Sequence, residues 1–171
     1  MSTASLPLSQ TETRKLRPLN IMRDLPQVAD LIELCFQNMD REGKRHVQQM
    51  RKDSKNRRWL SWASTSLPLK GFVWEEEKEI IGNISIVPFR RKKEKHILLA
   101  NVAVHPAHRR RGIARLLTQK ALEHIHKLRH DSIWVHVERD NQSAINLYQS
   151  LGFQRRAVRA TWEASTQVSP Q

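Results

Sequence analysis

Three consecutive arginines, Arg109 to Arg111, stand directly before Gly112 and are the clearest candidates for chemistry in this chain. An apolar alternating run precedes them and ends at Pro106, because proline cannot donate a hydrogen bond within a sheet. Apolar residues at helical spacing follow the glycine. A strand, a basic loop and a helix N-terminus in this order bring backbone N–H groups beside guanidinium groups, which is a way to hold a pyrophosphate. We therefore predict a site for a diphosphate-bearing cofactor.

Further elements are expected after the helix that follows Gly112. Residues 133–138 alternate apolar with polar side chains, which is the period of a strand. Asn141 is a favoured helix N-cap, and Gly152 suits the position just beyond a helix C-terminus, so a helix is predicted between them. A last strand is predicted from Phe153 to Trp162.

The N-terminal part of the chain predicts a short strand and two helices. The strand covers Leu16 to Leu19, and the first helix is expected to be capped by Asp24, with Pro26 in its first turn. Its apolar face consists of Val28, Leu31, Ile32, Cys35 and Met39. The second helical region, Arg41 to Trp62, is polar and strongly basic. Its apolar anchors are Val47, Met50, Trp59, Leu60 and Trp62.

The middle of the chain predicts an antiparallel hairpin. Phe72 to Trp74 and Ile80 to Val87 are its strands, and the acidic stretch Glu75 to Glu79 forms its turn. Phe89 to His96, with the sequence FRRKKEKH, is interpreted as a charged loop that leads into the next strand. After the first strand, the order α, α, β, β, β, α, β, α, β indicates a mixed-sheet α/β or α+β fold.

Length, charge and cysteine content limit the class of protein. At 171 residues the chain suits one domain, which we place at 16–163 between disordered tails at 1–15 and 164–171. Lys and Arg number 30 against 17 Asp and Glu, and this net charge of +13 favours anionic partners. The single cysteine, Cys35, is interpreted as a small buried hydrophobe in a reducing compartment, the cytoplasm. No run is long and apolar enough to span a membrane, so no membrane partner is expected.

The motifs of the C-terminal half resemble those of a known family. R-x-x-G-x-A from Arg109 to Ala114 follows a Val-x-Val strand, and Asn141 and Tyr148 precede the sequence LGF that begins at Leu151. Together they resemble the GNAT family of acetyl-CoA-dependent N-acetyltransferases, and they are most similar to the bacterial enzymes that acetylate ribosomal-protein alanine N-termini. The resemblance implies a GNAT fold, with a central mixed, mostly antiparallel sheet flanked by helices.

The resemblance also implies a site for acetyl-CoA as co-substrate, without a metal. Backbone groups of Val102 and Val104 would pair with the pantetheine arm. Asn141 would hydrogen-bond the cofactor, and Tyr148 would lie near its sulfur. Backbone amides of the pyrophosphate loop would approach the phosphate oxygens. This loop comprises Arg109, Arg110, Arg111, Gly112, Ile113, Ala114 and Arg115.

Acetyl transfer to an amine requires a neutral amine and a proton for the leaving thiolate. Tyr148 suits the role of general acid, because a phenol of pKa about 10 can protonate a thiolate of pKa about 8.5. It also fits the apolar face of its helix as a core residue. The family carries a glutamate where this chain has His136, so His136 is the candidate base, with Glu138 facing the same side of the strand. A purely structural role for His136 stays open.

The acceptor amine is left open by these motifs. A protein N-terminus, a lysine side chain and a small-molecule amine all remain, and the basic charge also admits an acidic substrate. At pH 7 an α-amine of pKa about 8 costs about 1.4 kcal/mol to deprotonate and a lysine about 4.6 kcal/mol, so an α-amine could manage with a modest base. Asn101, at the end of the apolar run, either positions substrate or marks a bulge.

A second function from another class fits the charge of the chain. A non-catalytic basic module on the same fold could bind nucleic acid or the ribosome, given basic stretches interleaved with tryptophans. Against it, the sequence has neither an RNA-recognition aromatic motif nor the spacing of zinc ligands. Arg41 to Arg58 and Arg90 to Lys95 are interpreted mostly as solvated faces. Residues 163–171 are too polar and short for the further strand that family members commonly add, so an oligomer in which a partner chain fills that edge is an open alternative.

Overall fold

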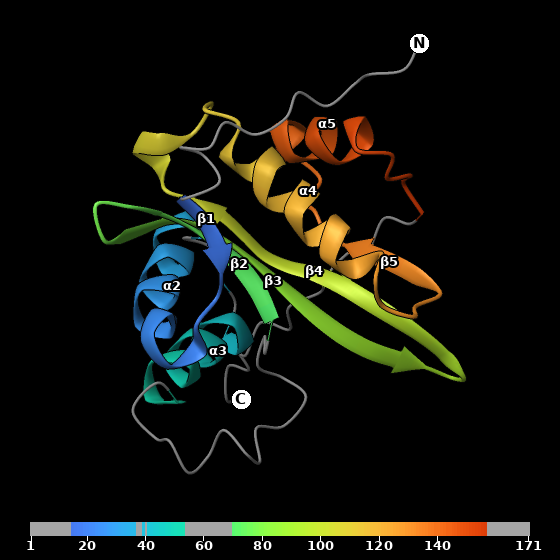
Figure 1. The fold of residues 1–171 in the computed structure, drawn as a ribbon, viewed down its shortest axis with the longest axis horizontal. Helices are drawn as coiled ribbons and strands as arrows, with labels where there is room; N and C mark the ends of the chain where they lie inside the picture. The colour runs from blue at the N-terminus through green and yellow to red at the C-terminus, as the bar shows by residue number, and fades with distance from the viewer. Residues whose placement is uncertain (1–14, 37–38, 40, 54–69, 157–171) are drawn as a thin grey trace, which may run out of the picture. The chain divides into compact units, whose positions relative to one another are not determined.

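The computed structural model describes residues 15–36, 39, 41–53 and 70–156. These residues fall into two compact units, one ending at His136 and one beginning at Val137, and each is described by itself. Figure 1 labels the elements. The first unit contains β1 Leu16–Pro18, α2 Ile21–Cys35, α3 Arg41–Asp53, β2 Lys70–Glu76, β3 Glu79–Arg91, β4 Glu94–Val104, the 3-10 turn η1 Pro106–His108, α4 Ile113–Ile125 and β5 Ser132–Val135. The second contains α5 Gln142–Ser150.

The five strands form one mixed sheet in the order β1-β2-β3-β4-β5. The first four strands pair antiparallel with their neighbours, and β5 pairs parallel with β4. This confirms the predicted mixed, mostly antiparallel sheet. The predicted hairpin is also confirmed, because β2 and β3 meet at a tight turn in which Glu77 (φ 49°) and Lys78 (φ 71°) both have positive φ. Such turns match the natural twist of the flanking strands.

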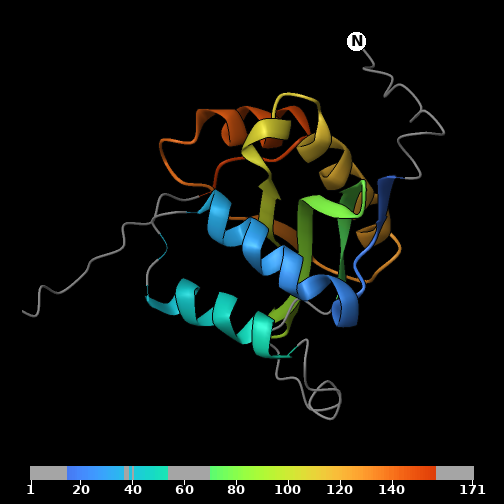
Figure 2. The ribbon, with the colours of Figure 1, turned by 90° about the vertical axis from the view of Figure 1, so that its left-hand side faces the viewer.

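Helices cover both faces of the sheet, and alternate residues of β2 point to opposite sides. Val73 is buried in a cluster with α2, whereas the ring of Phe72 packs edge-on against His124 of α4 at a centroid distance of 5.8 Å. Figure 2 shows α2 and α3 together on one side of the strands. On the other side, a Cβ at Gly82 would lie 2.9 Å from Cγ2 of Ile113, so glycine lets α4 pack directly on β3.

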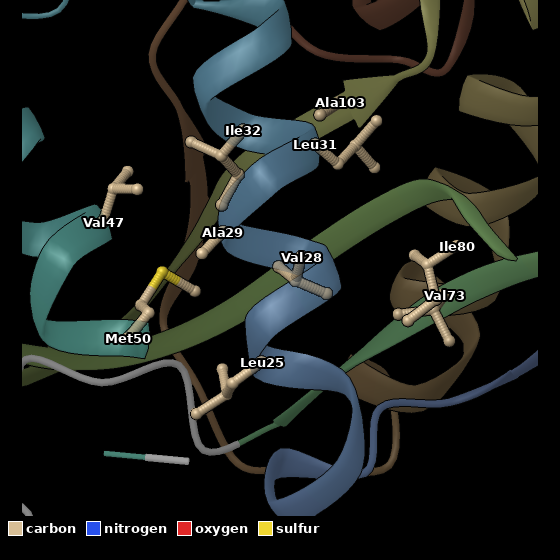
Figure 3. Close-up of a cluster of buried hydrophobic side chains, with 10 residues drawn as sticks. All are labelled: Leu25, Val28, Ala29, Leu31, Ile32, Val47, Met50, Val73, Ile80 and Ala103. Carbon is tan, nitrogen blue, oxygen red and sulfur yellow. The ribbon is translucent and has the colours of Figure 1, made fainter. Parts of the chain in front are cut away.

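The main apolar core lies between α2, α3 and the sheet, and Figure 3 shows its side chains. It confirms the predicted apolar face of α2 at Val28, Leu31 and Ile32, and the predicted anchors Val47 and Met50 of α3. Full burial of one such side chain contributes about 1.5–3 kcal/mol. Its members are Leu25, Val28, Ala29, Leu31, Ile32, Val47, Met50, Val73, Ile80 and Ala103. Cys35 and Met39 pack against it while half-buried. The other predicted anchors of the second helical region, Trp59, Leu60 and Trp62, lie outside the described residues.

The start of α2 differs from the prediction. Asn20 is the N-cap in place of Asp24, and its side-chain oxygen accepts from the backbone N–H groups of Met22 (3.1 Å) and Arg23 (3.3 Å). Pro26 therefore lies within the helix instead of in its first turn. Asp24 is buried and accepts from both guanidinium N–H groups of Arg17, at 2.6 and 3.0 Å. Burial acts to raise the pKa of Asp24, but the hydrogen bonds from Arg17 and the backbone outweigh it, and the pKa is lowered.

Three other predictions about elements need correction. The charged stretch Phe89 to His96 is a hairpin instead of a loop, since β3 and β4 stay paired as far as Arg91 and Glu94. Backbone hydrogen bonds hold that ladder, so charged side chains do not prevent it. The strand predicted over residues 133–138 ends at Val135. Of the predicted last strand, residues 153–156 are irregular and 157–162 lie outside the described residues, as do both predicted tails apart from Lys15.

Candidate functional site

A bulge in β4 interrupts the sheet where the candidate site begins. The β3–β4 register shifts between Asn83 and Ser85, and Asn101 on β4 has a φ of 51°, unusual for a residue other than glycine. The buried side chain of Asn83 donates from Nδ2 to the carbonyl of Asn101 at 2.9 Å. Asn101 therefore marks a bulge, one of the two roles considered for it.

Beyond the bulge, β4 runs on without β5 beside it. Among the described residues, β5 pairs with β4 only from His96 to Leu99. The N–H of His105 donates to the carbonyl of Ile81 on β3 at 2.8 Å. Because backbone groups alternate in direction along a strand, those of Val102 and Val104 point away from β3, toward the edge that β5 leaves uncovered. Such an edge can accept an extended, strand-like ligand.

The carbonyl of Val104 is already in contact with two side chains. Nε of Arg109 donates to it at 3.2 Å, and Sγ of Cys35 lies 3.3 Å from it. Cys35 is a free thiol at the end of α2, and it is half-buried where the sequence predicts a buried side chain. Arg109 therefore helps to fix the position of the loop relative to the strand that precedes it.

The loop between β4 and α4 adopts a conformation that presents backbone N–H groups. Arg110 (φ 65°) and Gly112 (φ 79°) are both left-handed, and such alternations create concavities lined by N–H groups. A Cβ on Gly112 would meet no atom within 4 Å, so the backbone angle, and not crowding by protein atoms, is what favours glycine. Gly112 caps α4 without any side-chain hydrogen bond, which leaves the positive end of the helix open to a ligand.

The predicted loop residues differ in what their side chains do. Arg110 is exposed and has no ion pair among the described residues, whereas Ile113 is only 2% exposed and can contribute through its backbone alone. Ala114 is half-buried and Arg115 is exposed in the first turn of α4. Arg111 is bound to Glu76 of β2, with nitrogen–oxygen distances of 2.7 and 3.3 Å.

Glu76 is a site residue that sequence reasoning missed, because only its place in an acidic turn distinguished it. Its carboxylate also accepts from Lys15 and from Nε1 of Trp74, each at 3.0 Å. The hydrogen bonds from Arg111, and then those from Trp74 and Lys15, lower the pKa of Glu76 from its usual 4.5 to about 2. Arg111 also donates to Nδ1 of His108 at 2.6 Å. Glu76 therefore anchors the loop to β2 at neutral pH.

In the second unit, Asn141 is the N-cap of α5 and Tyr148 lies in the last turn of the same helix. Asn141 is the N-cap of α5, as predicted, and its Oδ1 accepts from the N–H of Ala144 at 3.0 Å. Tyr148 is 5% exposed and packs edge-on against Phe153 at a centroid distance of 5.6 Å. Burial raises the pKa of Tyr148 to about 12. Full proton transfer from this phenol to a thiolate of pKa about 8.5 is then uphill by about 5 kcal/mol.

His136 and Glu138 do not share a strand face, because the strand ends at Val135. His136 is exposed and closes the first unit. Glu138 is exposed in the second unit, where its carbonyl accepts from the N–H of Asn141 at 3.1 Å. The described residues contain no cluster of three His, Cys, Asp or Glu side chains suited to a metal. None of the described helices is long and apolar enough to cross a membrane.

The fold is that of a class of acetyltransferases. A GCN5-related N-acetyltransferase from Ralstonia eutropha JMP134 has the same fold, with a TM-score of 0.65 over 88% of this chain and 98% of that chain, at 22% identity. The profile of the acetyltransferase (GNAT) family matches residues 25–153. The chain therefore belongs to the GNAT family, as its motifs predict.

Two curated proteins from Escherichia coli (strain K12) are similar to this chain. The peptidyl-lysine N-acetyltransferase YiaC is 34% identical over 99 residues, which cover 58% of this chain and 58% of that protein. The [ribosomal protein bS18]-alanine N-acetyltransferase is 34% identical over 68 residues, which cover 40% of this chain and 46% of that protein. The chain thus spans about half the length of these relatives.

Proposed function

We propose that this chain transfers an acetyl group from acetyl-CoA to a primary amine, by direct attack of the amine on the thioester. One observation carries the proposal: the uncovered edge of β4 beyond Leu99 leads directly into a loop with left-handed residues at Arg110 and Gly112. An extended pantetheine arm suits the edge, and a pyrophosphate suits the loop. Membership of the GNAT family supports the same reading.

In this proposal β4 and the loop that follows it hold the cofactor. The backbone groups of Val102 and Val104 pair with the pantetheine, and the N–H groups from Gly112 to Ala114 bind phosphate oxygens. Arg109 and Arg110 add positive charge beside those oxygens. Arg111 stays hydrogen-bonded to Glu76 and contributes by fixing the conformation of the loop. When bound, acetyl-CoA supplies an activated acyl group.

The proton transfers are proposed for Tyr148 and His136. Because its pKa is raised to about 12, Tyr148 stays a hydrogen-bond donor at neutral pH. In this proposal it donates to the departing sulfur and releases its proton only as charge develops there. Asn141 hydrogen-bonds the cofactor through the amide nitrogen that its capping bond leaves available. His136, exposed after β5, accepts the proton of the amine directly or through water.

We propose a protein amine as the acceptor. The relatives are named for peptidyl lysine and for a ribosomal-protein alanine, and both names refer to amines of proteins. An α-amine makes the smaller demand on a base, since its deprotonation at pH 7 costs about 3 kcal/mol less than that of lysine. A modest base such as His136 is sufficient for it.

A thiol-release assay tests the proposal with acetyl-CoA and two peptide sets, one with free N-termini and one with lysine as its only amine. Turnover is expected with the first set, together with a thermal shift on addition of acetyl-CoA. Substitution Tyr148→Phe should slow thiol release without abolishing that shift, and His136→Ala should also slow it without abolishing the shift. Absence of both thiol release and the thermal shift would refute the proposal. Salt-sensitive RNA binding without that shift would instead favour a non-catalytic module.

A further inference from the structure

Two basic segments, distant in sequence, lie together at one end of the first unit. The tip of the β3–β4 hairpin extends past β2, whose pairing with β3 stops at Ile86 among the described residues (Figure 1). The loop between α4 and β5 lies beside the tip. The N–H of Asp131 donates to the carbonyl of Lys95 at 2.8 Å, and the N–H of Lys95 donates to Oδ2 of Asp131 at 2.6 Å.

Seven exposed cations gather on these two segments, and we call them the basic end. They are Arg90, Arg91, Lys92, Lys93, Lys95, Lys127 and Arg129. None has an ion pair among the described residues, whereas Arg17, Arg51 and Arg111 elsewhere each bind a carboxylate. Two carboxylates belong to the same segments. Oε2 of Glu94 lies 3.4 Å from Nε2 of His96, and Oδ2 of Asp131 accepts from the backbone N–H of Lys95. The positive charge of the basic end is therefore not compensated locally.

The composition of the basic end favours a polyphosphate over a protein partner. Protein interfaces have an apolar centre from which lysine is depleted. Here the exposed large apolar side chains are Phe89 and Leu128, 38% and 36% exposed, and lysines and arginines surround them. Phosphate contacts need no apolar centre, and one exposed ring can stack on a base. The ring of Phe89 is held 5.1 Å from that of the buried His96, which fixes its position.

We propose that the basic end binds the phosphodiester backbone of a nucleic acid. This surface is distinct from the proposed acetyl-CoA site, because the two lie at opposite ends of β4. The hairpin tip is at Glu94, and the proposed pantetheine edge is near Val104. At about 3.3 Å per residue the two ends of this strand lie roughly 33 Å apart. The nucleic acid and acetyl-CoA can therefore bind at the same time. The inference goes beyond the proposed function and does not depend on it.

The test measures fluorescence anisotropy of labelled single-stranded RNA, single-stranded DNA and duplexes of each at several salt concentrations. The tip variant combines Arg91→Gln, Lys92→Asn and Lys93→Gln. Its matched control removes the same charge from exposed positions of α3, with Lys44→Gln, Arg45→Gln and Lys52→Gln. An unchanged thermal shift with acetyl-CoA, or an unchanged melting temperature where no shift occurs, verifies that both variants fold.

The tip variant is expected to weaken binding at least tenfold and to reduce the slope of log affinity against log salt by about 2. The α3 variant should bind within twofold of the native chain. A preference for RNA or DNA among the probes would identify the natural ligand. Equal losses in both variants would overturn the proposal, because only overall charge would then matter. Failure of the native chain to bind every one of these nucleic acid probes would overturn it too.

Discussion

Replacing Glu76 by glutamine should destabilise the chain in a pH-dependent way. A carboxylate whose pKa is about 2 when folded and about 4.5 when unfolded contributes at most about 3.4 kcal/mol. The side chain of Glu76 is 17% exposed, and its partners Arg111 and Lys15 are 43% and 35% exposed. Solvent screening reduces the contribution to about 1–2 kcal/mol. For a chain of this size the melting temperature should fall by about 2–8 °C.

The pH dependence distinguishes this charge effect from simple loss of packing. Because the folded pKa is depressed, the stabilisation is fully present above about pH 4.5 and is lost as pH falls toward 2. The difference in unfolding free energy between the native chain and Glu76→Gln, measured in urea at pH 7 and pH 3, should therefore shrink by more than half. Glu79→Gln, an exposed glutamate at the start of β3, is the matched control and should change little. A difference that is the same at both pH values would refute this reasoning.

Three further substitutions test the phosphate loop, the proposed general acid and the apolar core. Gly112→Ala forces alanine into a left-handed conformation, which costs about 1–2 kcal/mol, and acetyl-CoA titration should show at least tenfold weaker binding. The control Gly152→Ala, also at positive φ, should lose stability without weaker acetyl-CoA binding. Equal weakening of acetyl-CoA binding in both variants would contradict the assignment of Gly112 to the phosphate loop. Tyr148→Phe should slow thiol release about 100-fold, and the native pH–rate profile should show no phenol ionisation below about pH 10; unchanged turnover would remove the proposed acid. Met50→Ala leaves a cavity in the core and should lower the free energy of unfolding in urea by about 2–5 kcal/mol. Substitution of the exposed Gln48 by alanine should lower it by less than about 0.5 kcal/mol. Similar losses in the two variants would contradict the assigned core.

Local patterns were enough to predict the parts of the fold that depend on neighbouring residues. The apolar face of α2 and the β2–β3 hairpin follow from periodicity, which the chain carries whatever it packs against. Gly112 and Gly152 both have positive φ, which an L side chain rarely adopts, so their positions mark the beginning of α4 and the end of α5. Asn141 caps its helix through a hydrogen bond three residues away. The roles of Tyr148 and His136 remain predictions.

Contacts between distant residues decided the rest. Asn20 caps α2, whereas the carboxylate of Asp24 accepts from Arg17 and from the backbone N–H of Asn20. The strand after α4 ends at Val135, whose partner Leu99 lies two residues before the bulge at Asn101. Periodicity shows neither event, because it reports which side chains share a face and not which group each polar side chain or strand binds.

The candidate site shows the same division. The chain by itself determined a strand, an arginine-rich loop, a glycine and a helix, because each is a local preference of the backbone or of side-chain spacing. Only the tertiary structure decided that Arg111 binds Glu76, 35 residues away, while Arg110 has no ion pair within the described part of the chain. It likewise brought Lys127 and Arg129 beside the β3–β4 hairpin. Charge is visible in a sequence, but whether a charge is neutralised depends on which distant residue the fold places against it.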